Sequence, residues 1–149
     1  MASKTARPAY FPALAAERPD IAMCRASAYL ARAADAHATR HGLGVGQHLV
    51  LKMLDTVGPC SQQVLSEELR IDRSVMVNVC DDLEQSGFVR RERNPEDRRS
   101  YAVTLTDEGR ERLAEAESTV SSYLDETFAP LTTSERAQLT ALISKLMQL

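Results

Sequence analysis

Apolar side chains recur every three or four residues along most of the chain, the spacing of helices that bury one face. An alanine-rich segment over 20–41, free of Gly and Pro, predicts a first long helix. Residues 1–19 contain three prolines and are expected to form an irregular arm before it. Shorter helices should follow over 47–57, 62–69 and 72–86, separated by glycine, proline and turn residues. Ser61 and Asp72 are the expected N-caps of the last two of these helices. Their predicted core-facing side chains are Val50, Leu51, Leu54, Val64, Leu65, Leu69, Val75, Val79 and Leu83, with Met76 and Cys80 at the boundary.

After these helices the apolar pattern changes from a helical to an alternating one. Two strands are expected over 88–93 and 101–105, and the turn-rich stretch 94–99 should close them into a hairpin. A long helix is then predicted over 107–128, and a last helix after a Thr132–Glu135 capping box. The order predicts a mainly α fold with a small β-hairpin wing. This order of elements is the one expected of a winged helix-turn-helix domain with a helical lobe attached.

The charges are unevenly spread along the chain. The net charge of −3 does not by itself point to nucleic acid. Fifteen of the eighteen basic residues are Arg, however, and five of these fall within 90–99. Because Arg binds phosphates and base edges through a planar fork of donors, the hairpin should carry a basic tip. No apolar run is long enough to cross a membrane and no short leader opens the chain, so we expect a cytoplasmic protein without membrane contact.

The segment 72–86 has the length of a helix that fits the major groove of DNA. Near its start, its outer side carries Arg73, Ser74, Val77 and Asn78. An Arg can bind guanine, an Asn can bind adenine, and a Val can touch a thymine methyl. Backbone N–H groups at helix starts near Ser61 and Ser74 can hold phosphates, and the hairpin tip supplies Arg98 and Arg99. A solvated hairpin edge that binds nothing would explain the same tip arginines.

Residues 47–113 resemble the MarR family of bacterial transcription regulators. The similarity is carried by Asp72-Arg73-Ser74, by Leu83 to Arg91, by Asn94 to Arg99 and by Val103 to Arg110. An acidic residue followed closely by Arg, in front of a Leu-Thr-x-x-Gly helix start, is more specific than a bare helix-turn-helix. The resemblance implies a homodimeric repressor, less often an activator, which a small-molecule effector releases from double-stranded DNA.

The resemblance also implies roles for particular residues. The side chains that would face the major groove of a palindromic operator are Arg73, Ser74, Val77 and Asn78. In the wing, Asp97 would brace the turn, and Arg99, with Arg98 beside it, would enter the minor groove. Two features depart from the family pattern. Threonine and arginine are common where this chain has Val77 and Asn78, and Asp81 and Asp82 add negative charge to the recognition helix. We expect these two carboxylates to face away from phosphates or to pair with Arg.

The long first and fifth predicted helices exceed what a small winged domain needs. Their apolar stripes require a partner surface, within one chain or in a second copy. A two-fold dimer would place two half-sites about one DNA turn apart. The expected organisation is therefore an arm (1–19) followed by a single domain (20–149), with dimerisation helices at 20–41 and 107–149, a winged helix-turn-helix at 47–106, its helix-turn-helix at about 61–86 and its wing at 88–105.

Three widely separated cysteines suit reduced thiols rather than a disulfide framework. Cys24 is the candidate sensor of a thiol-based redox regulator, which is the alternative to a ligand-responsive one. Burial as a small apolar side chain is the competing expectation for Cys24, and the one we favour. Cys60 and Cys80 are expected to be packing residues.

Three histidines complete the candidate sensing residues. His37 and His41 lie four residues apart on one helical face, and His48 follows a glycine-rich turn. This spacing is compatible with a metal, but no dense Cys/His cluster accompanies it, so we expect no metal and no cofactor. We interpret the histidines as lining a polar helix seam or an effector pocket.

Other classes of function have less support. No nucleophile–base pair, phosphate-binding loop or metal motif stands out, so the protein is not expected to be an enzyme, and a small helical enzyme is a remote alternative. A helical dimer that docks only proteins, with a passive wing, is a third possibility.

Overall fold

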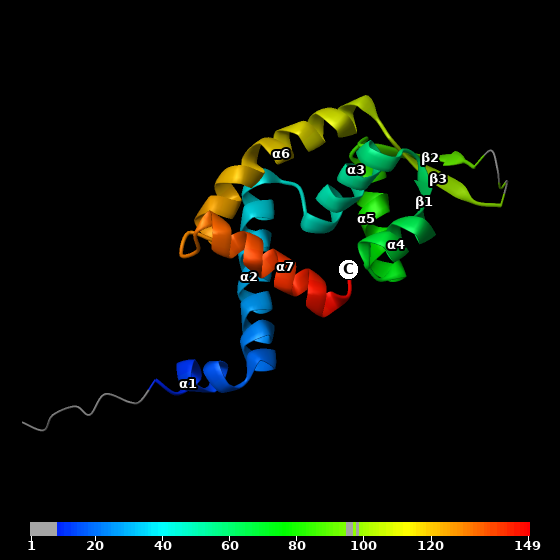
Figure 1. The fold of residues 1–149 in the computed structure, drawn as a ribbon. Coiled ribbons are helices and arrows are strands. Elements are labelled where there is room, and N and C mark those ends of the chain that lie inside the picture. The colour runs from blue at the N-terminus through cyan, green and yellow to red at the C-terminus, as the bar shows by residue number, and fades with distance from the viewer. Residues whose placement is uncertain (1–8, 95–96, 98) are drawn as a thin grey trace, which may run out of the picture.

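Helices dominate the structure, and a small sheet projects from one end of it (Figure 1). A computed structural model describes residues 9–94, 97 and 99–149. The elements in chain order are α1 (Tyr10–Glu17), α2 (Pro19–His41), α3 (Val45–Val57), β1 (Cys60–Ser61), α4 (Gln62–Leu69), α5 (Arg73–Gln85), β2 (Val89–Arg93), β3 (Tyr101–Leu105), α6 (Asp107–Thr127) and α7 (Thr133–Met147). Among the described residues, no helix has both the length and the apolar character needed to cross a membrane.

The sheet is antiparallel with the strand order β1-β3-β2. β2 and β3 pair from Val89 opposite Leu105 to Arg93 opposite Tyr101, which confirms the predicted hairpin. The two-residue strand β1 was not predicted, because a segment this short has no alternation to detect. β1 pairs with the other edge of β3 and so fastens the start of α4 to the wing.

The core lies between residues 43 and 116. It consists of Leu43, Val50, Leu51, Leu54, Leu65, Met76, Cys80, Leu83, Val89, Val103, Leu105, Leu113 and Ala116. The three predicted core residues of α3 are confirmed, and so is Leu65 of α4. Val64, by contrast, is 41% exposed, and its predicted core position is wrong. α3, α4, α5, the sheet and the first half of α6 therefore form one packed unit.

The buried face of α5 differs by about one residue from the predicted one. Met76, Cys80 and Leu83 are buried, whereas Val75 is 49% exposed and Val79 only partly covered. Both sets have helical spacing, so the period alone does not decide between them. The packing of α5 against α3 and α4 selects the stripe through Met76 and Cys80. The prediction of Val75 as a core residue is wrong.

The junction between the wing and α6 is closely packed. Thr106 caps α6 by accepting a hydrogen bond from the Gly109 N–H (3.0 Å), and its hydroxyl donates to the Gly87 carbonyl (2.6 Å). A Cβ at Gly109 would collide with the Phe88 carbonyl and come within 2.8 Å of Leu105. The Leu-Thr-x-x-Gly motif therefore has a physical basis, since only glycine permits α6 to start so close to the wing.

Residues 10–17 form the helix α1, so the prediction of an irregular arm over 1–19 is wrong for this part. Residues 1–8 lie outside the described residues. Pro12 occupies the first turn of α1, where a missing N–H breaks no helical hydrogen bond. Pro19 stands at the first position of α2. Both prolines start helices here rather than preventing them.

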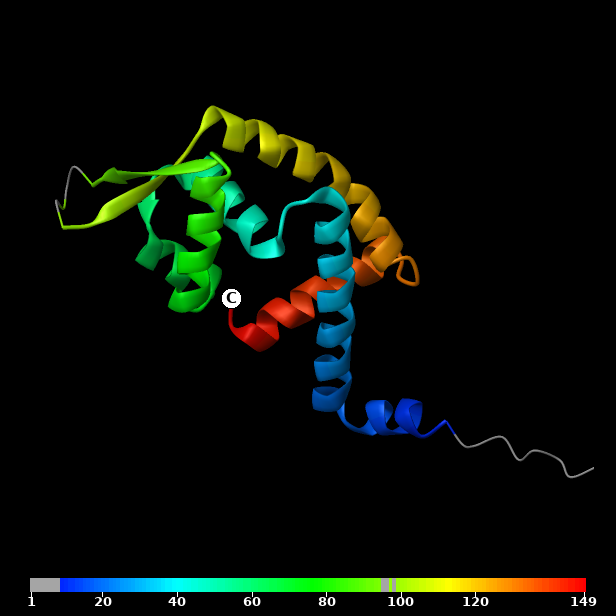
Figure 2. The ribbon, with the colours of Figure 1, turned by 180° about the vertical axis from the view of Figure 1, so that it is seen from behind.

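The remaining helices extend away from the core. α6 runs from the base of the wing to a group formed with α2 and α7, and α1 lies at the end of α2 farthest from the wing (Figures 1 and 2). The α7 capping box is confirmed, because Thr132 and Glu135 each bond to the other's backbone N–H (3.2 and 2.8 Å). α1, α2 and α7 contribute no buried residue.

Candidate nucleic-acid interface

One side of α5 is fixed to the core, and its opposite side is exposed. Arg73, Ser74, Val77 and Asn78 all lie exposed on the side that the sequence predicts to be outer. The Arg73 guanidinium lies 3.7 Å from the Glu67 carboxylate, a weak ion pair at an exposed site. The four side chains predicted to read DNA are thus accessible together.

The two helix starts beside this face are capped differently. The Ser61 hydroxyl accepts a hydrogen bond from the Val64 N–H (3.2 Å) and so caps α4, as predicted. Asp72 was expected to cap α5, but its side chain makes no capping hydrogen bond. Ser74 lies exposed in the first turn of α5. The first N–H groups of α5 therefore lack a side-chain cap from Asp72, a setting in which helix starts attract anions.

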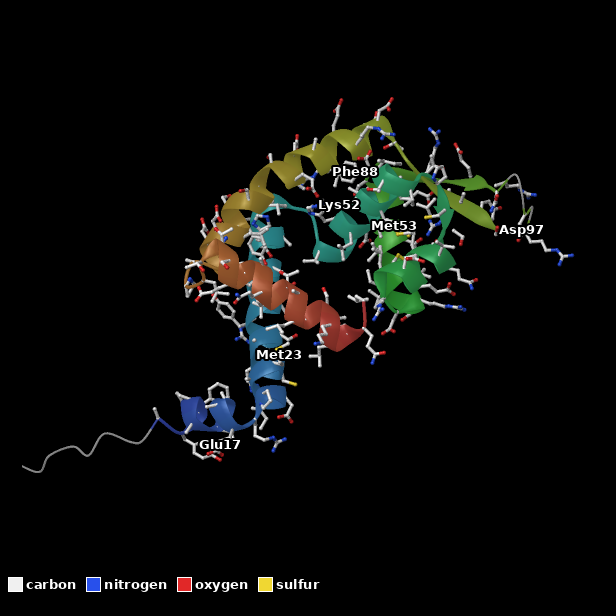
Figure 3. All side chains as sticks on the ribbon, in the orientation of Figure 1. Glu17, Met23, Lys52, Met53, Phe88 and Asp97 are labelled. Carbon is white, nitrogen blue, oxygen red and sulfur yellow. The ribbon has the colours of Figure 1, made fainter. Side chains whose placement is uncertain are left out.

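The turn of the wing is organised by Asp97, which Figure 3 shows at the tip of the hairpin. Its carboxylate accepts a hydrogen bond from the Arg99 backbone N–H (3.0 Å), and its carbonyl accepts one from the Ser100 N–H (3.0 Å). This local bonding leaves the Arg99 residue exposed. Arg98, the other predicted wing contact, lies outside the described residues.

A hollow of about 450 Å³ separates the start of α4 from the wing. Its lining residues are Ser61, Gln62, Gln63, Arg91, Asn94, Asp97, Ser100, Tyr101 and Val103. The hollow thus joins two predicted contact regions, the α4 start and the wing. Its polar lining offers hydrogen-bond donors to a nucleic-acid backbone.

Arg91 on β2 is a functional candidate that sequence reasoning missed. Its guanidinium donates to the carboxylates of Asp81 and Glu84 (2.5 Å each) and twice to the Gln62 amide oxygen (2.8 and 2.9 Å). Glu84 also accepts a hydrogen bond from the Arg91 backbone N–H (3.0 Å). Because these partners are up to 29 residues away in the sequence, no local pattern marks them.

The two aspartates of the recognition helix have different surroundings. Asp81 pairs with Arg91, which confirms the expectation that an Arg compensates it. Asp82 is exposed, and within the described part of the chain its side chain makes no hydrogen bond or ion pair. Asp82 therefore remains an uncompensated negative charge beside the exposed face of α5.

A second cavity, of about 410 Å³, lies where the two groups of helices meet. It is lined from α2, α3 and α6 and from the loop before α3 by Ala34, His37, Ala38, Leu43, Val45, His48, Leu49, Lys52, Glu117, Val120 and Tyr123. The predicted pocket residues His37 and His48 both lie in it, whereas His41 stacks on His37 from outside the lining (centroids 4.5 Å apart). Within the described residues, no group of three or more metal-ligating side chains is placed to hold an ion.

Hydrogen bonds across this cavity connect the two groups of helices. Glu117 of α6 bonds to His48 (2.6 Å) and accepts from Lys52 (2.9 Å), both on α3. These hydrogen bonds hold the pKa of the Glu117 carboxyl below its usual value. His37 of α2 bonds to Thr119 of α6 (3.0 Å), and burial lowers the pKa of His37.

The cysteines are placed only partly as expected. Cys80 is buried and Cys60 packs against the core, which confirms their role as packing residues. Burial raises the pKa of Cys80 to about 11 and also raises that of Cys60, so both stay protonated. Cys24 is exposed within this chain, where α2 has no buried residue, so the expectation of burial is wrong.

Exposed recognition-helix side chains, a hydrogen-bonded wing and a basic hairpin together define a winged helix-turn-helix protein of the DNA-binding class. Comparison with known proteins is consistent with this class. Residues 43–101 match the model of the MarR family. The chain is 33% identical over 105 residues to YkoM of Bacillus subtilis, described as an HTH-type transcriptional regulator, covering 70% of this chain and 68% of that protein.

Two solved structures extend the similarity over most of the fold. BpsR of Bordetella bronchiseptica, whose DNA binding is regulated by 6-hydroxynicotinic acid, has a TM-score of 0.82 and 25% identity, covering 89% of this chain and 95% of that one. The transcriptional repressor CouR, bound to a 23-mer DNA duplex, has a TM-score of 0.81 and 28% identity, covering 89% and 94%. The chain belongs to the MarR family and is a transcriptional regulator.

Proposed function

We propose that this regulator binds a palindromic operator as a homodimer and represses transcription until an effector releases it. In this proposal one α5 enters each of two successive major grooves. The observation that carries the proposal is the division of α5 into two faces. Met76, Cys80 and Leu83 anchor one face, and Arg73, Ser74, Val77 and Asn78 are exposed on the other.

Contacts to the DNA backbone would flank this readout. Arg99 would enter the minor groove with Arg98 beside it, while Asp97 holds the turn that presents Arg99. The start of α4 at Ser61 would bind a phosphate through its N–H groups. Such contacts fix the orientation of α5 on the duplex without reading sequence.

The second part of the proposal concerns the dimer. Leu142, Leu146 and Leu149 are 66%, 70% and 72% exposed, and α7 has no buried residue. A partner's apolar surface would cover this face, so that 20–41 and 107–149 form the dimerisation region and 47–106 the winged domain. The protein would act in the cytoplasm as a regulator rather than as an enzyme.

The cavity between α2, α3 and α6 is the proposed effector site. Its walls are largely apolar, and His48, Lys52 and Glu117 supply a few polar groups, the composition of a small-molecule site. An acidic aromatic effector, like the one that regulates BpsR, would compete with Glu117 for the donors on His48 and Lys52. Losing the Glu117 contacts would change how α3 sits on α6, and with it the spacing of two recognition helices.

A footprinting and binding experiment on the DNA that flanks the gene tests the proposal. We expect a symmetric protected site. Asn78→Ala should change the preferred base at one position of each half-site, while Arg99→Ala should weaken binding about tenfold on every sequence. Arg32→Ala, an exposed α2 arginine away from the proposed DNA contacts, is the matched control, and sedimentation checks that this variant associates as the unmodified protein does. Absence of a protected site, or an equal loss on all sequences for Asn78→Ala, contradicts the assignment.

The same assay with 6-hydroxynicotinic acid and related aromatic acids tests the effector site. Acids that enter the cavity should raise the melting temperature of the free protein and weaken its operator binding. Glu117→Gln should shift the response to lower acid concentrations, because the competing carboxylate is gone. If none of the acids changes either quantity, an acidic aromatic effector is ruled out.

A further inference from the structure

The guanidinium of Arg91 is fully engaged inside the winged domain. Each of its three nitrogens donates to an acceptor on another element, either Asp81 and Glu84 on α5 or Gln62 at the start of α4. The Arg91 side chain is 23% exposed, whereas that of its neighbour Arg90 is 61% exposed and pairs with Glu92 on the same strand. Arg91 is thus the arginine of β2 that joins three elements of the DNA-binding unit.

Two of the partners of Arg91 are acidic residues on α5, and acidic residues are unusual on a helix that approaches DNA. Asp81 and Glu84 place two carboxylates on α5, with side chains 56% and 40% exposed. A carboxylate near a phosphate backbone opposes binding, and low salt increases the effect. The Arg91 cation offsets part of this charge at a distance of 2.5 Å. Asp82 has no such partner among the described residues. It therefore allows an unpaired acid to be compared with two paired acids on the same helix.

The contact between Arg91 and Gln62 also joins α4 to this group of side chains. Gln62 stands at the first position of α4, and its amide oxygen accepts from two nitrogens of Arg91. The wing strand, the recognition helix and the start of α4 are therefore joined through one side chain. A lysine at position 91 would keep the charge but lose the planar fork that reaches all three partners.

We propose that Arg91 is a positioning residue of the DNA interface: it offsets part of the negative charge of Asp81 and Glu84 on the recognition helix and fixes the wing and α4 relative to α5, without itself contacting DNA. The inference rests on the proposed DNA binding and goes beyond the assigned contacts. It distinguishes Arg91 from Arg99, which is exposed and available to the duplex.

A charge-rescue series on purified full-length protein tests this role. The variants are Arg91→Met, Asp81→Asn with Glu84→Gln, and the triple combination of all three changes. Arg90→Met is the control for losing one cation from the same strand, and Asp82→Asn is the control for removing an unpaired acid from the same helix. Affinity is measured at low salt on a random-sequence duplex, and on DNA flanking the gene, with the melting temperature of each variant.

On the random-sequence duplex, Arg91→Met should lose about tenfold in affinity, and the triple variant should regain most of that loss. The Asp81→Asn/Glu84→Gln variant should bind more tightly than the unmodified protein, because the Arg91 charge is no longer compensated. Arg90→Met should lose less than Arg91→Met. A triple variant as weak as Arg91→Met would overturn the proposal, since a direct phosphate contact is not rescued by removing acids.

Two further measurements separate positioning from simple folding effects. If Arg91→Met melts below the assay temperature, the Asp81→Asn/Glu84→Gln variant, which retains Arg91, still tests the inference. Unchanged or weaker DNA binding by this variant overturns it. Arg91→Lys should bind the random-sequence duplex normally but lose preference for the flanking DNA, and an unchanged preference contradicts the orienting role. Failure of the proposed function is distinguishable, because the unmodified protein would then bind neither duplex.

Discussion

The two groups of helices in this chain differ in how completely they are packed. Residues 43–116 supply the core cluster, in which Val50, Leu51, Leu65 and Met76 have no exposed surface. α1, α2 and α7 have no buried residue, and large apolar side chains such as Tyr10 (74% exposed) and Leu146 (70%) remain uncovered. The DNA-binding unit is complete within one chain, whereas the helical group lacks a partner surface.

This difference indicates what each region contributes to stability. A packed core gains free energy from every buried side chain and tolerates little change in volume. Exposed apolar faces gain the same free energy only when a second surface covers them. Mutations in the first region should therefore act on folding, and those in the second on assembly.

The largest effect is expected where the packed unit joins α6. Gly109→Ala places a Cβ against the Phe88 carbonyl and Leu105, so the start of α6 must move away from the wing. We expect a loss of about 3 kcal/mol in the free energy of unfolding, although alanine favours helices. Thermal or urea denaturation followed by circular dichroism measures it.

Gly46→Ala is the matched control for this substitution. A Cβ at Gly46 on α3 meets one methyl of Val79 at 3.3 Å, a contact that a small shift relieves. The change in stability should stay below about 1 kcal/mol, because the helix propensity gained offsets the contact. Equal effects of the two substitutions would show that the wing does not depend on the close approach of α6.

The features that were predictable from sequence are those encoded by nearby residues. The caps at Ser61, Thr106 and Thr132 bond three residues ahead, so their patterns are visible in the chain. The hairpin follows from alternation on two adjacent strands. Local chemistry thus predicted the order of the elements from α2 onward, with the exception of β1, and the predicted bounds lie within two residues of those observed.

The features that the sequence did not predict depend on which other helices and strands pack against a segment. The stripes through Val75 and through Met76 have the same helical spacing, and only the position of α3 and α4 selects between them. The Arg91 cluster joins residues 7, 10 and 29 positions apart. The exposure of Cys24 likewise depends on how little of α2 is covered within this chain. Local spacing carries none of this information.

The second-largest effect is expected in the less packed region, at the exposed apolar face of α7. Leu146→Asp places a charge in the middle of the exposed apolar face of α7. The variant should sediment as a monomer at concentrations where the unmodified protein is a dimer. Because each half-site is then bound singly, operator affinity should fall about a hundredfold. The signal of the folded winged domain should persist.

Gln138→Asp, which adds the same charge at an exposed polar position of α7, should leave the dimer intact. Analytical ultracentrifugation with parallel binding assays separates the two variants. An unmodified protein that sediments as a monomer would refute the interpretation that a second copy covers this face.

The smallest effect concerns a contact inside the less packed region, between α2 and the second half of α6. His37 of α2 faces Thr119 and Tyr123 of α6, and its titratable neighbours His41 and Arg40 lie on its own helix. Burial, and then these charges, keep the pKa of His37 below its usual value of about 6.5, although Glu126 opposes the shift and His48 adds to it.

A lowered histidine pKa means that the unfolded chain binds the proton more readily than the folded chain. Stability is therefore highest at neutral pH and falls as the pH drops below about 6.5. Because the site is partly solvated, the melting temperature should fall by only about 2 °C between pH 7.5 and 5.5 relative to His37→Asn. His41→Asn should weaken this pH dependence without removing it, because His41 contributes to the lowered pKa of His37 but burial is the larger cause. The lowered pKa of Glu117 adds a second loss that begins below about pH 4.5 and is complete once the pH has fallen through that lowered pKa, where the carboxylate takes up a proton and the contacts with His48 and Lys52 weaken. A His37→Asn profile parallel to that of the unmodified protein would show that this contact between α2 and α6 does not titrate.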